Sequence, residues 1–238
     1  MCGRFTLTRT DLREVAEILE AELDEELAEA YQPRYNAAPS NILWLLVNEG
    51  GRRIVSGRWG FPMPFGPKQD DPVGLINARS ETAADKPTFR DAFARRRCAV
   101  ISDGFFEWAG PKGRRRPTWF HAPSLELLLM AGLWRERADP ETGEVERRFT
   151  ILTTEANAVI EPSHARMPAF LPPASVDPWL APAPPARSKD AQRRFAAGLG
   201  GLLRPADNAL LVATPVSSRV GNVRNDDPAC IEPERTLF

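Results

Sequence analysis

The sequence predicts an α+β fold: one domain built on an antiparallel sheet that curls or closes, with helices around it. Its 238 residues are 42% hydrophobic, which suffices for one sizeable core and favours a single domain over residues 1–238. Short apolar runs separated by turn residues follow one another along the chain, a pattern typical of antiparallel sheets. No apolar run is long enough to cross a bilayer and no hydrophobic leader is present, so we expect a cytoplasmic protein.

The first element expected is a helix from Thr10 to about Ala30, because apolar residues recur there at helical spacing behind Thr10 as an N-cap. Residues 62–72 and 165–185 are rich in Pro and predict irregular surface segments. The remaining expected elements are strands at residues 42–47, 53–59, 98–102, 105–108, 118–121, 125–134, 147–153 and 209–213, and helices at residues 89–97 and 189–197, the last ended by Gly198.

Charge is distributed unevenly along the chain. The formal net charge of −1 divides into −8 over residues 11–30 and +7 over the rest. The acidic run is typical of the solvated face of a helix. Arginine supplies 27 of the 31 basic residues, which suits bidentate phosphate recognition, although base composition of a genome produces the same bias. The three cysteines are far apart, with no Cys/His pair at ligand spacing, so neither a disulfide framework nor a metal site is expected.

Cys2 is the first candidate for chemistry. Once Met1 is removed, Cys2 carries an α-amine and a thiol on adjacent carbons, and both nucleophiles can reach one electrophilic centre. The amine adds to an aldehyde to give a Schiff base, and the thiol then closes a five-membered thiazolidine. Ordinary pKa values of about 7.7–8.0 for an α-amine and about 8.5 for a thiol leave a reactive fraction of each near neutrality. The alternative is that a small residue at position 2 merely permits Met1 removal.

Such a nucleophile needs proton-transfer groups, and the sequence offers few. Glu107 lies between Phe106 and Trp108 in a strand pattern, where an apolar surround suits a carboxyl group to acid–base work. The chain has two histidines. His164 lies in a proline-punctuated loop beside Arg166 and is the better acid–base candidate, whereas His121 lies within an apolar strand pattern and is expected to be structural.

Eight segments taken together resemble, in order, the motifs of the SOS response-associated peptidase family. They are distributed along almost the whole chain: Cys2 to Phe5, Tyr35 to Pro39, Trp59-Gly60, Ile76 to Thr82, Asp103 to Trp108, Thr153 to Asn157, His164 to Pro168, and Val216 to Pro233. The resemblance implies a single α+β domain with an antiparallel β-barrel-like core and peripheral helices. It also implies a DNA-repair protein that shields abasic sites in single-stranded DNA through a covalent thiazolidine on the N-terminal cysteine.

The family roles carry over to matching positions. Cys2 would form the thiazolidine, Glu107 would orient its amine and relay a proton, Asn77 would donate a hydrogen bond at the attachment point, and His164 would act on the ring oxygen of the sugar. The resemblance further implies DNA contacts by Arg4, Pro39, Trp59, Phe65, Arg79, Trp108, Thr153 and Arg166, with the three arginines on phosphates. Phe65 stands where the family usually has a second Trp, and Gly221 replaces a frequent Asn, which weakens the expectation for the DNA path.

Two other classes stay open. A cysteine peptidase or amidase would use Cys2 as the acyl nucleophile, His164 as base and Asn77 at the oxyanion. A non-enzymatic reader of single-stranded or junction DNA would bind without a covalent product. Arginines interleaved with loop aromatics favour the crosslinking protein over the amidase, because a phosphate groove needs them and an amidase pocket does not. No cofactor is expected, the partner expected is abasic single-stranded DNA or its junction with duplex, and the protein is expected to be a monomer that joins the nucleoid at damaged DNA.

Overall fold

The core of the protein is a closed five-stranded barrel. The computed structural model describes residues 2–63, 71, 73–111, 113–138, 142–184 and 188–234. The barrel strands are β4 (Ile42–Asn48), β5 (Arg52–Trp59), β7 (Arg97–Ser102), β10 (Leu128–Ala138) and β11 (Val145–Glu155). Four antiparallel pairings join them in the order β11-β10-β7-β4-β5, and a parallel pairing of β11 with β5 closes the ring. The predicted α+β class with a barrel-like core is therefore confirmed.

Large aromatic side chains fill the barrel where it closes. Trp59 and Phe149 lie opposite each other in the β5–β11 pairing and stack with their ring centroids 6.3 Å apart. Phe5 packs on the other side of Trp59 at 5.1 Å. All three side chains are at most 1% exposed. Complete burial of one such side chain stabilises the folded state by about 1.5–3 kcal/mol, so this contact is a major part of what closes the sheet.

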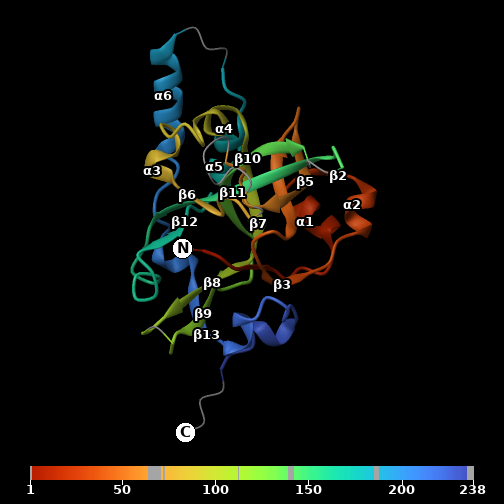
Figure 1. The fold of residues 1–238 in the computed structure, drawn as a ribbon, viewed down its shortest axis with the longest axis vertical. Coiled ribbons are helices and arrows are strands. Elements are labelled where there is room, and N and C mark those ends of the chain that lie inside the picture. The colour runs from red at the N-terminus through yellow and green to blue at the C-terminus, as the bar shows by residue number, and fades with distance from the viewer. Residues whose placement is uncertain are drawn as a thin grey trace.

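A second sheet of five strands carries the N-terminus. Its strand order is β13-β9-β8-β1-β3. The bounds are β1 (Phe5–Leu7), β3 (Arg34–Ala37), β8 (Gly104–Ala109), β9 (Arg116–His121) and β13 (Val212–Pro215). Figure 1 shows this sheet below the barrel, with the N-terminus between the two parts of the molecule.

Asp103 fixes the N-terminal strand at the junction of the two sheets. Its buried carboxylate accepts hydrogen bonds from the Thr6 hydroxyl and the Thr8 backbone N–H, both at 2.5 Å, and from the Thr8 hydroxyl at 2.7 Å. The next residue is Gly104, where a Cβ would lie 2.3 Å from the Trp119 indole nitrogen. The Asp-Gly pair therefore holds β1 against β8, and this contact sets the position of Cys2.

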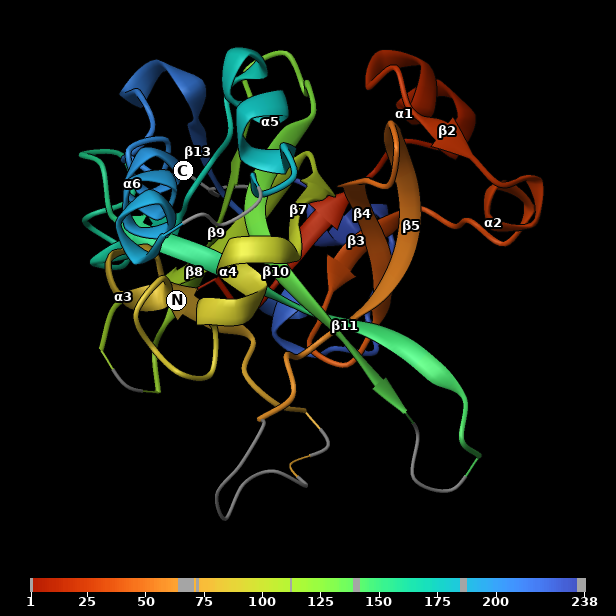
Figure 2. The ribbon, with the colours of Figure 1, turned by 90° about the horizontal axis from the view of Figure 1, so that it is seen from above.

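Short helices surround the two sheets, as Figure 2 shows from above, and three short strands extend the sheet that forms the barrel. The helices are α1 (Leu12–Ile18), α2 (Glu25–Glu29), α3 (Ser80–Ala83), α4 (Arg90–Arg95), α5 (Pro173–Leu180) and α6 (Lys189–Gly200), with 3-10 turns at Asn208–Leu210, Ser218–Gly221 and Pro228–Cys230. The remaining strands are β2 (Glu22–Leu23), β6 (Asn77–Arg79) and β12 (Arg166–Pro168). In the part of the chain that the structure describes, no helix is long and apolar enough to span a membrane.

The single helix expected from Thr10 to Ala30 is wrong. The helix begins after Asp11, whose side chain accepts from the Arg13 N–H at 2.9 Å, and it ends at Ile18. Glu20 has a positive φ of 50°, and the chain then pairs in parallel with β5 before α2 begins. The apolar spacing of this segment is compatible with a helix, but pairing with the exposed edge of β5 overrides it, an effect that a local pattern cannot show.

Four further expectations differ from the structure. Residues 173–180, expected to be irregular, form α5, because Pro173 occupies its first turn, where a missing N–H costs nothing, and Val176 and Trp179 are buried. The helix at 189 runs past Gly198 to Gly200, and the last strand lies at 212–215 rather than 209–213. Arg97 belongs to β7 rather than to the preceding helix. Most of the 62–72 segment lies outside the described residues.

Candidate functional site

Cys2 lies at the seam between the two sheets, with Asn77 from one side and Glu107 from the other. The Asn77 side-chain amide donates to the Cys2 carbonyl at 2.7 Å. The Cys2 thiol donates to the Arg4 carbonyl at 3.6 Å. Cys2 itself has no exposed surface. Two segments distant in sequence, those of Asn77 and Glu107, therefore meet at Cys2, the residue that the sequence predicted to react.

The surroundings of Cys2 keep its thiol protonated. Burial raises the pKa of the Cys2 thiol well above its ordinary value, and the nearby Glu107 carboxylate raises it further. Reactive cysteines of peptidases show the opposite shift, because a neighbouring cation stabilises the thiolate. The site therefore places a buried thiol close to the Glu107 carboxylate, and both burial and this charge oppose ionisation of the thiol.

Asn77 is held rigidly and retains an acceptor. It begins β6, which pairs in parallel with β11, Asn77 lying opposite Ile151. Its amide nitrogen is used by Cys2, while its Oδ1 is buried and has no hydrogen-bond partner among the described residues. A buried acceptor left unpaired costs about 1–3 kcal/mol, and a hydrogen bond from a hydroxyl or N–H would remove this cost.

Glu107 comes from β8, two residues after Phe105. Only 4% of it is exposed, and it lies opposite Thr118 of β9. Side chains alternate along a strand, so Glu107 shares a face with Phe105, while Phe106 and Trp108 pack in a separate small cluster on the other face. The alternation directs the carboxylate toward Cys2 and sends the neighbouring aromatics away from it.

His164 lies two residues before the start of β12. Its Nδ1 accepts from the Arg166 backbone N–H at 2.9 Å, so Nε2 is the ring nitrogen left for proton transfer. No hydrogen bond joins Cys2 to either histidine within the described residues. His121 bridges the Ala122 carbonyl (2.8 Å) and the Thr214 hydroxyl (2.9 Å), contacts that fit the structural role expected for it.

Three arginines flank the cysteine, and their guanidinium groups are in different states. The Arg4 group donates to neutral acceptors, Asn36 Oδ1 and the Val220 carbonyl, each at 2.9 Å, and lies 5.9 Å from the Trp108 ring centre. Burial lowers the pKa of Arg4. Arg79 is exposed where β6 meets α3. Among the described residues, no ion pair involves Arg4 or Arg79.

Arg166 is already paired. Its two terminal nitrogens donate to the two carboxylate oxygens of Glu81 at 2.7 and 2.8 Å, and one of them also donates to the Thr153 carbonyl at 2.5 Å. Only 13% of the Arg166 side chain is exposed. The pair lowers the pKa of Glu81, chiefly through the hydrogen bonds from Arg166. Glu81 was not singled out from the sequence, although it lies in the quoted motif from Ile76 to Thr82.

The other expected DNA-contacting residues divide by exposure. Pro39 and Trp108 are half-buried at the surface. Trp59 and Thr153 have no exposed surface, because the Trp59 indole donates to the Ile76 carbonyl at 2.9 Å within the barrel core and Thr153 lies between β6 and β12. Neither side chain reaches the surface, so both position β6 rather than face solvent. Phe65 lies outside the described residues.

Asn36 is a residue that sequence reasoning missed. Its side-chain amide donates to the carbonyls of Val220, Asn222 and Asn225 at 2.7–3.1 Å, while its Oδ1 accepts from Arg4. Asp226 reinforces this contact by accepting from the Asn36 N–H at 2.7 Å. The C-terminal segment is thereby fastened beside the N-terminus. Asn36 lies in the motif from Tyr35 to Pro39, but its role in holding the C-terminal segment depends on Val220, which is 184 residues away.

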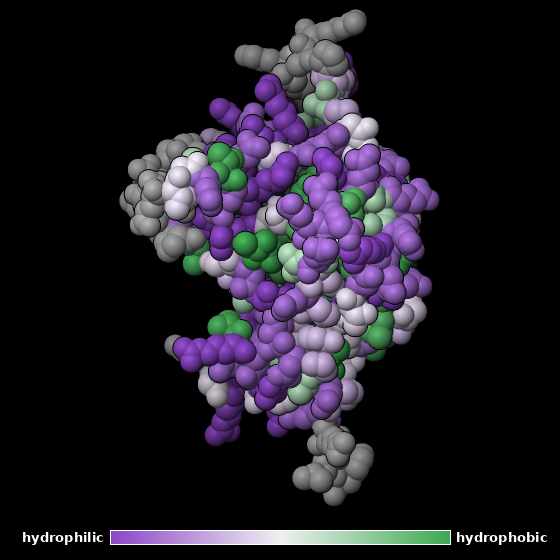
Figure 3. Space-filling model, turned by 90° about the vertical axis from the view of Figure 1, so that its right-hand side faces the viewer, coloured by the Kyte–Doolittle hydropathy of each residue, from purple (hydrophilic) through white to green (hydrophobic). Residues whose placement is uncertain are grey.

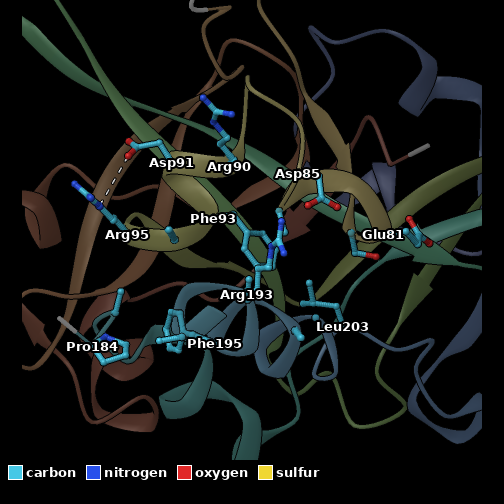
Figure 4. A pocket seen from close by; sticks show the side chains of 18 of the residues that line it. Glu81, Asp85, Arg90, Asp91, Phe93, Arg95, Pro184, Arg193, Phe195 and Leu203 are labelled. Atoms are coloured by element: carbon cyan, nitrogen blue, oxygen red, sulfur yellow. Dashed lines mark ion pairs between the residues drawn. The ribbon is translucent and has the colours of Figure 1, made fainter. Parts of the chain in front are cut away.

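A cavity of about 1150 Å³ lies between α4 and α6, away from Cys2. Figure 4 shows Phe93 and Phe195 on its walls and acidic and basic side chains around it, with Asp91 and Arg95 paired at 3.9 Å. The lining residues nearest to the arginines described above are Ser80, which follows Arg79, Glu81, which pairs with Arg166, and Thr154, which follows Thr153. Among the described residues no group of three or more His, Cys, Asp or Glu side chains is placed to hold a metal ion.

This combination of fold and N-terminal site belongs to one known class. The model of the SOS response associated peptidase (SRAP) family matches residues 1–223, and the chain is a member of that family. The resemblance drawn from the ordered motifs is therefore confirmed.

Particular relatives and structures agree. The chain is 36% identical to the abasic site processing protein YoqW of Bacillus subtilis, over 98% of this chain and 99% of that protein. It is 29% identical to the abasic site processing protein HMCES of Gallus gallus, over 85% of this chain and 67% of that protein. A crystal structure from Bacteroides thetaiotaomicron superposes with a TM-score of 0.81 at 24% identity, covering 99% of this chain and 100% of that one, which shows the common fold.

Proposed function

We propose that this protein processes abasic sites in single-stranded DNA by forming a covalent thiazolidine between Cys2 and the opened sugar. Membership of the SRAP family supports this, as do the names of relatives aligned over nearly the full chain, which describe abasic site processing. The observation that carries the proposal is the environment of Cys2. A buried neutral thiol between Asn77 and Glu107 suits an aminothiol that attacks first through nitrogen.

The chemistry balances without a co-reactant. The free amine of Cys2 adds to C1′ of the aldehyde, and one water leaves as the imine forms. The thiol then adds across the C=N bond: sulfur bonds to carbon, and the thiol proton passes to nitrogen. Because the thiol is protonated until this step, its raised pKa is no obstacle, provided that a neighbouring base accepts the proton in transit.

Each polar neighbour has a part in this sequence. Glu107 takes and returns the protons of the amine and thiol. Asn77 offers its unpaired Oδ1 to a sugar hydroxyl while its amide nitrogen holds the Cys2 backbone. His164, through Nε2, protonates the ring oxygen so that the hemiacetal opens to the aldehyde. Arg4 and Arg79 bind the flanking phosphates, and the half-buried Trp108 and Pro39 support the neighbouring bases.

The competing function is a cysteine peptidase, because the name of the SRAP family includes the word peptidase. A peptidase with Cys2 as nucleophile and His164 as base needs a hydrogen bond between these two side chains. The raised pKa of Cys2 argues against a thiolate, and the described residues include no Cys2–histidine hydrogen bond. We therefore assign the covalent role to the aminothiol.

The test is a denaturing gel. The protein is incubated with a single-stranded oligonucleotide that carries one abasic site, and with the same oligonucleotide intact. We expect a denaturant-resistant band with the abasic strand only, and none with Cys2→Ala. Cys2→Ser retains the amine and should give a product only after borohydride capture of the imine. Hydrolysis of a peptide substrate without any crosslink would overturn the proposal in favour of the peptidase.

A further inference from the structure

The hairpin between β8 and β9 ends in a cluster of exposed arginines that the mechanism above does not use. Arg114, Arg115 and Arg116 are all exposed. Gly110 and Gly113 have positive φ values of 105° and 87°, and the Arg114 N–H donates to the Pro111 carbonyl at 3.0 Å. Positive φ values of this kind favour glycine, which suits both positions. The three residues, called here the arginine tip, lie where the chain enters β9.

The charges of the arginine tip are nearly uncompensated. Within the described chain no ion pair involves Arg114 or Arg115. The carboxylate nearest to Arg116 is that of Glu234, at 3.8 Å, and these side chains are 83% and 46% exposed. An ion pair so exposed contributes about 0–1 kcal/mol. The tip is therefore available to an external anion, unlike Arg166, which Glu81 already neutralises.

Strand register connects the tip to the reactive site. Glu107 lies opposite Thr118, and Ala109 lies opposite Arg116. Residues two apart on a strand share a face, and paired residues share it too, so Arg116 projects from the face that carries Glu107. Two residues advance the strand by about 7 Å, which is about two phosphate spacings of a stacked strand. A strand whose sugar is held at Cys2 can thus reach the tip within a few nucleotides.

The tip lies on the opposite side of Cys2 from Arg79. Asn77 and Arg79 come from β6 next to the barrel, whereas the tip ends the hairpin of the second sheet. Figure 1 shows the N-terminus between these two parts. In Figure 3 the outline is indented at the corresponding height, and hydrophilic side chains project below the indentation. Phosphates on both flanks of a lesion at Cys2 would therefore meet arginines, with Arg79 on one flank and the tip on the other.

We propose that the arginine tip is a second phosphate-binding surface, which holds the backbone of the same DNA strand on one flank of the abasic site. This rests on the proposed function, because it is the sugar at Cys2 that places the strand. The tip supplies affinity and orientation and takes no part in the covalent step. The arginine tip therefore adds affinity only for DNA whose strand extends far enough on the side of the abasic site that faces the tip.

The experiment combines an arginine variant with trimmed DNA. Reversible binding is measured by fluorescence anisotropy in a Cys2→Ala background, with abasic oligonucleotides that carry about eight nucleotides on the 5′ side only, the 3′ side only, or both. The variant is Arg114→Ala with Arg115→Ala. The matched control, Arg193→Ala with Arg194→Ala, removes the same charge from exposed positions on α6, at the other end of the molecule.

We expect the tip variant to weaken binding about tenfold on the two-flank DNA and on one single-flank DNA, and not on the other. The slope of log affinity against log salt should fall by about 1.4, the value for two phosphate contacts on a single strand. The control should lose little on any DNA. Equal losses on both single-flank DNAs, or none on either, would overturn the proposal. The crosslinking gel with Cys2 intact separates this outcome from failure of the proposed function, since a band at saturating protein is expected for the tip variant in every case.

Discussion

At the scale of single residues, Cys2 and Glu107 form a pair whose electrostatics oppose ionisation of the thiol. Burial is the larger cause of the raised Cys2 pKa and the Glu107 carboxylate the second. A carboxylate beside a nucleophilic thiol is unhelpful for thiolate attack, but it is well placed for an amine that must lose a proton. In the proposed reaction, this arrangement favours attack by nitrogen before sulfur.

Glu107→Gln separates these effects. Removal of the negative charge should lower the pKa of the Cys2 thiol, although burial keeps it above the ordinary value. Alkylation of Cys2, followed residue by residue by mass spectrometry because Cys98 and Cys230 are also free, should therefore reach half its maximal rate at lower pH. Crosslinking should slow by about 10²-fold or more, the scale of a lost acid–base group.

The control for this variant is Glu126→Gln, which neutralises an exposed carboxylate. It should change neither the pH dependence of Cys2 alkylation nor the rate of crosslinking. An alkylation profile of Glu107→Gln that stays in place or moves to higher pH would show that the carboxylate does not act on the thiol.

In a second pair, Glu81 occupies the guanidinium group of Arg166, which is one of the residues expected to bind DNA. The carboxylate occupies the two terminal nitrogens that a phosphate would need. Glu81→Gln should release Arg166 and raise affinity for single-stranded DNA by a few-fold, with a steeper salt dependence. Asp85→Asn removes the same charge from an exposed neighbour that has no hydrogen bond to Arg166 and should change affinity less.

Anisotropy titrations in an Arg166→Ala background complete this test. In that background, Glu81→Gln should no longer raise the affinity for single-stranded DNA, because the increase requires the Arg166 side chain that Glu81 occupies. Weaker binding by Glu81→Gln alone would mean instead that Glu81 positions Arg166 for phosphate rather than competing with it.

At the scale of elements, Arg97 joins two helix ends to the barrel. Only 5% of Arg97 is exposed, and its guanidinium donates to carbonyls at the end of α4, those of Phe93 and Ala94, and at the end of α5, those of Trp179 and Ala181. Burial lowers its pKa to about 10. The described part of the chain shows no carboxylate paired with it, so the helix carbonyls and the rings of Trp179 and Phe195, 5.9 and 5.2 Å from the guanidinium carbon, balance the charge.

Arg97→Lys should destabilise the fold strongly. Lysine has three donors on one atom and cannot span carbonyls from two helices, so at least one or two buried acceptors lose their partners at about 1–3 kcal/mol each. We expect the free energy of unfolding in urea to fall by about 3 kcal/mol in total. Arg96→Lys, at the next position, with its side chain 38% exposed, should change it by less than about 0.5 kcal/mol. Equal, small effects of the two substitutions would contradict the structural role of Arg97.

Local pattern predicted the elements unevenly. The hairpin of β4 and β5 and the central strands β7 to β11 were found within a few residues, because alternation and turn residues are local signals. The N-terminal helix was drawn too long and α5 was missed, because β2 depends on the edge of a distant strand and α5 on burial of Trp179 against β7. The three-residue strands β1, β6 and β12 carry no period of their own.

The candidate site was more predictable than some of the elements that hold it. Ordered motifs indicated Cys2, Asn77, Glu107 and His164 as candidates, and the structure brings the first three together. Motifs did not show that Trp59 lies inside the barrel or that Arg166 is paired with Glu81. Both facts depend on contacts between segments, whose geometry no single segment encodes.

At the scale of the whole molecule, chain folding delivers the N-terminus to groups supplied by both sheets. Asp103 and β8 fix β1, Asn77 comes from a strand 75 residues away, and the C-terminal segment locks Arg4 through Asn36. A site assembled in this way exists only in the complete fold. Its reactive atom, however, depends on a single covalent event, the loss of Met1.

Retention of Met1 should therefore separate binding from chemistry. With Met1 attached, the Cys2 nitrogen is a peptide amide without a basic lone pair, so neither an imine nor a thiazolidine can form there. The thiol alone gives at most a reversible hemithioacetal. A chain carrying uncleaved residues ahead of Cys2 should bind abasic single-stranded DNA through its arginines, with affinity within about threefold of the processed chain, yet leave no denaturant-resistant band.

Intact mass spectrometry establishes which form is present, and the gel reports the product. The matched control carries a protease site immediately before Cys2, so that cleavage of the same preparation exposes the amine. Crosslinking should appear in proportion to the fraction cleaved, because each released Cys2 regains both nucleophiles. If a preparation shown by mass to retain its extension formed the stable adduct at the full rate, the α-amine would not be the primary nucleophile. The buried thiol would then have to react first, against its raised pKa.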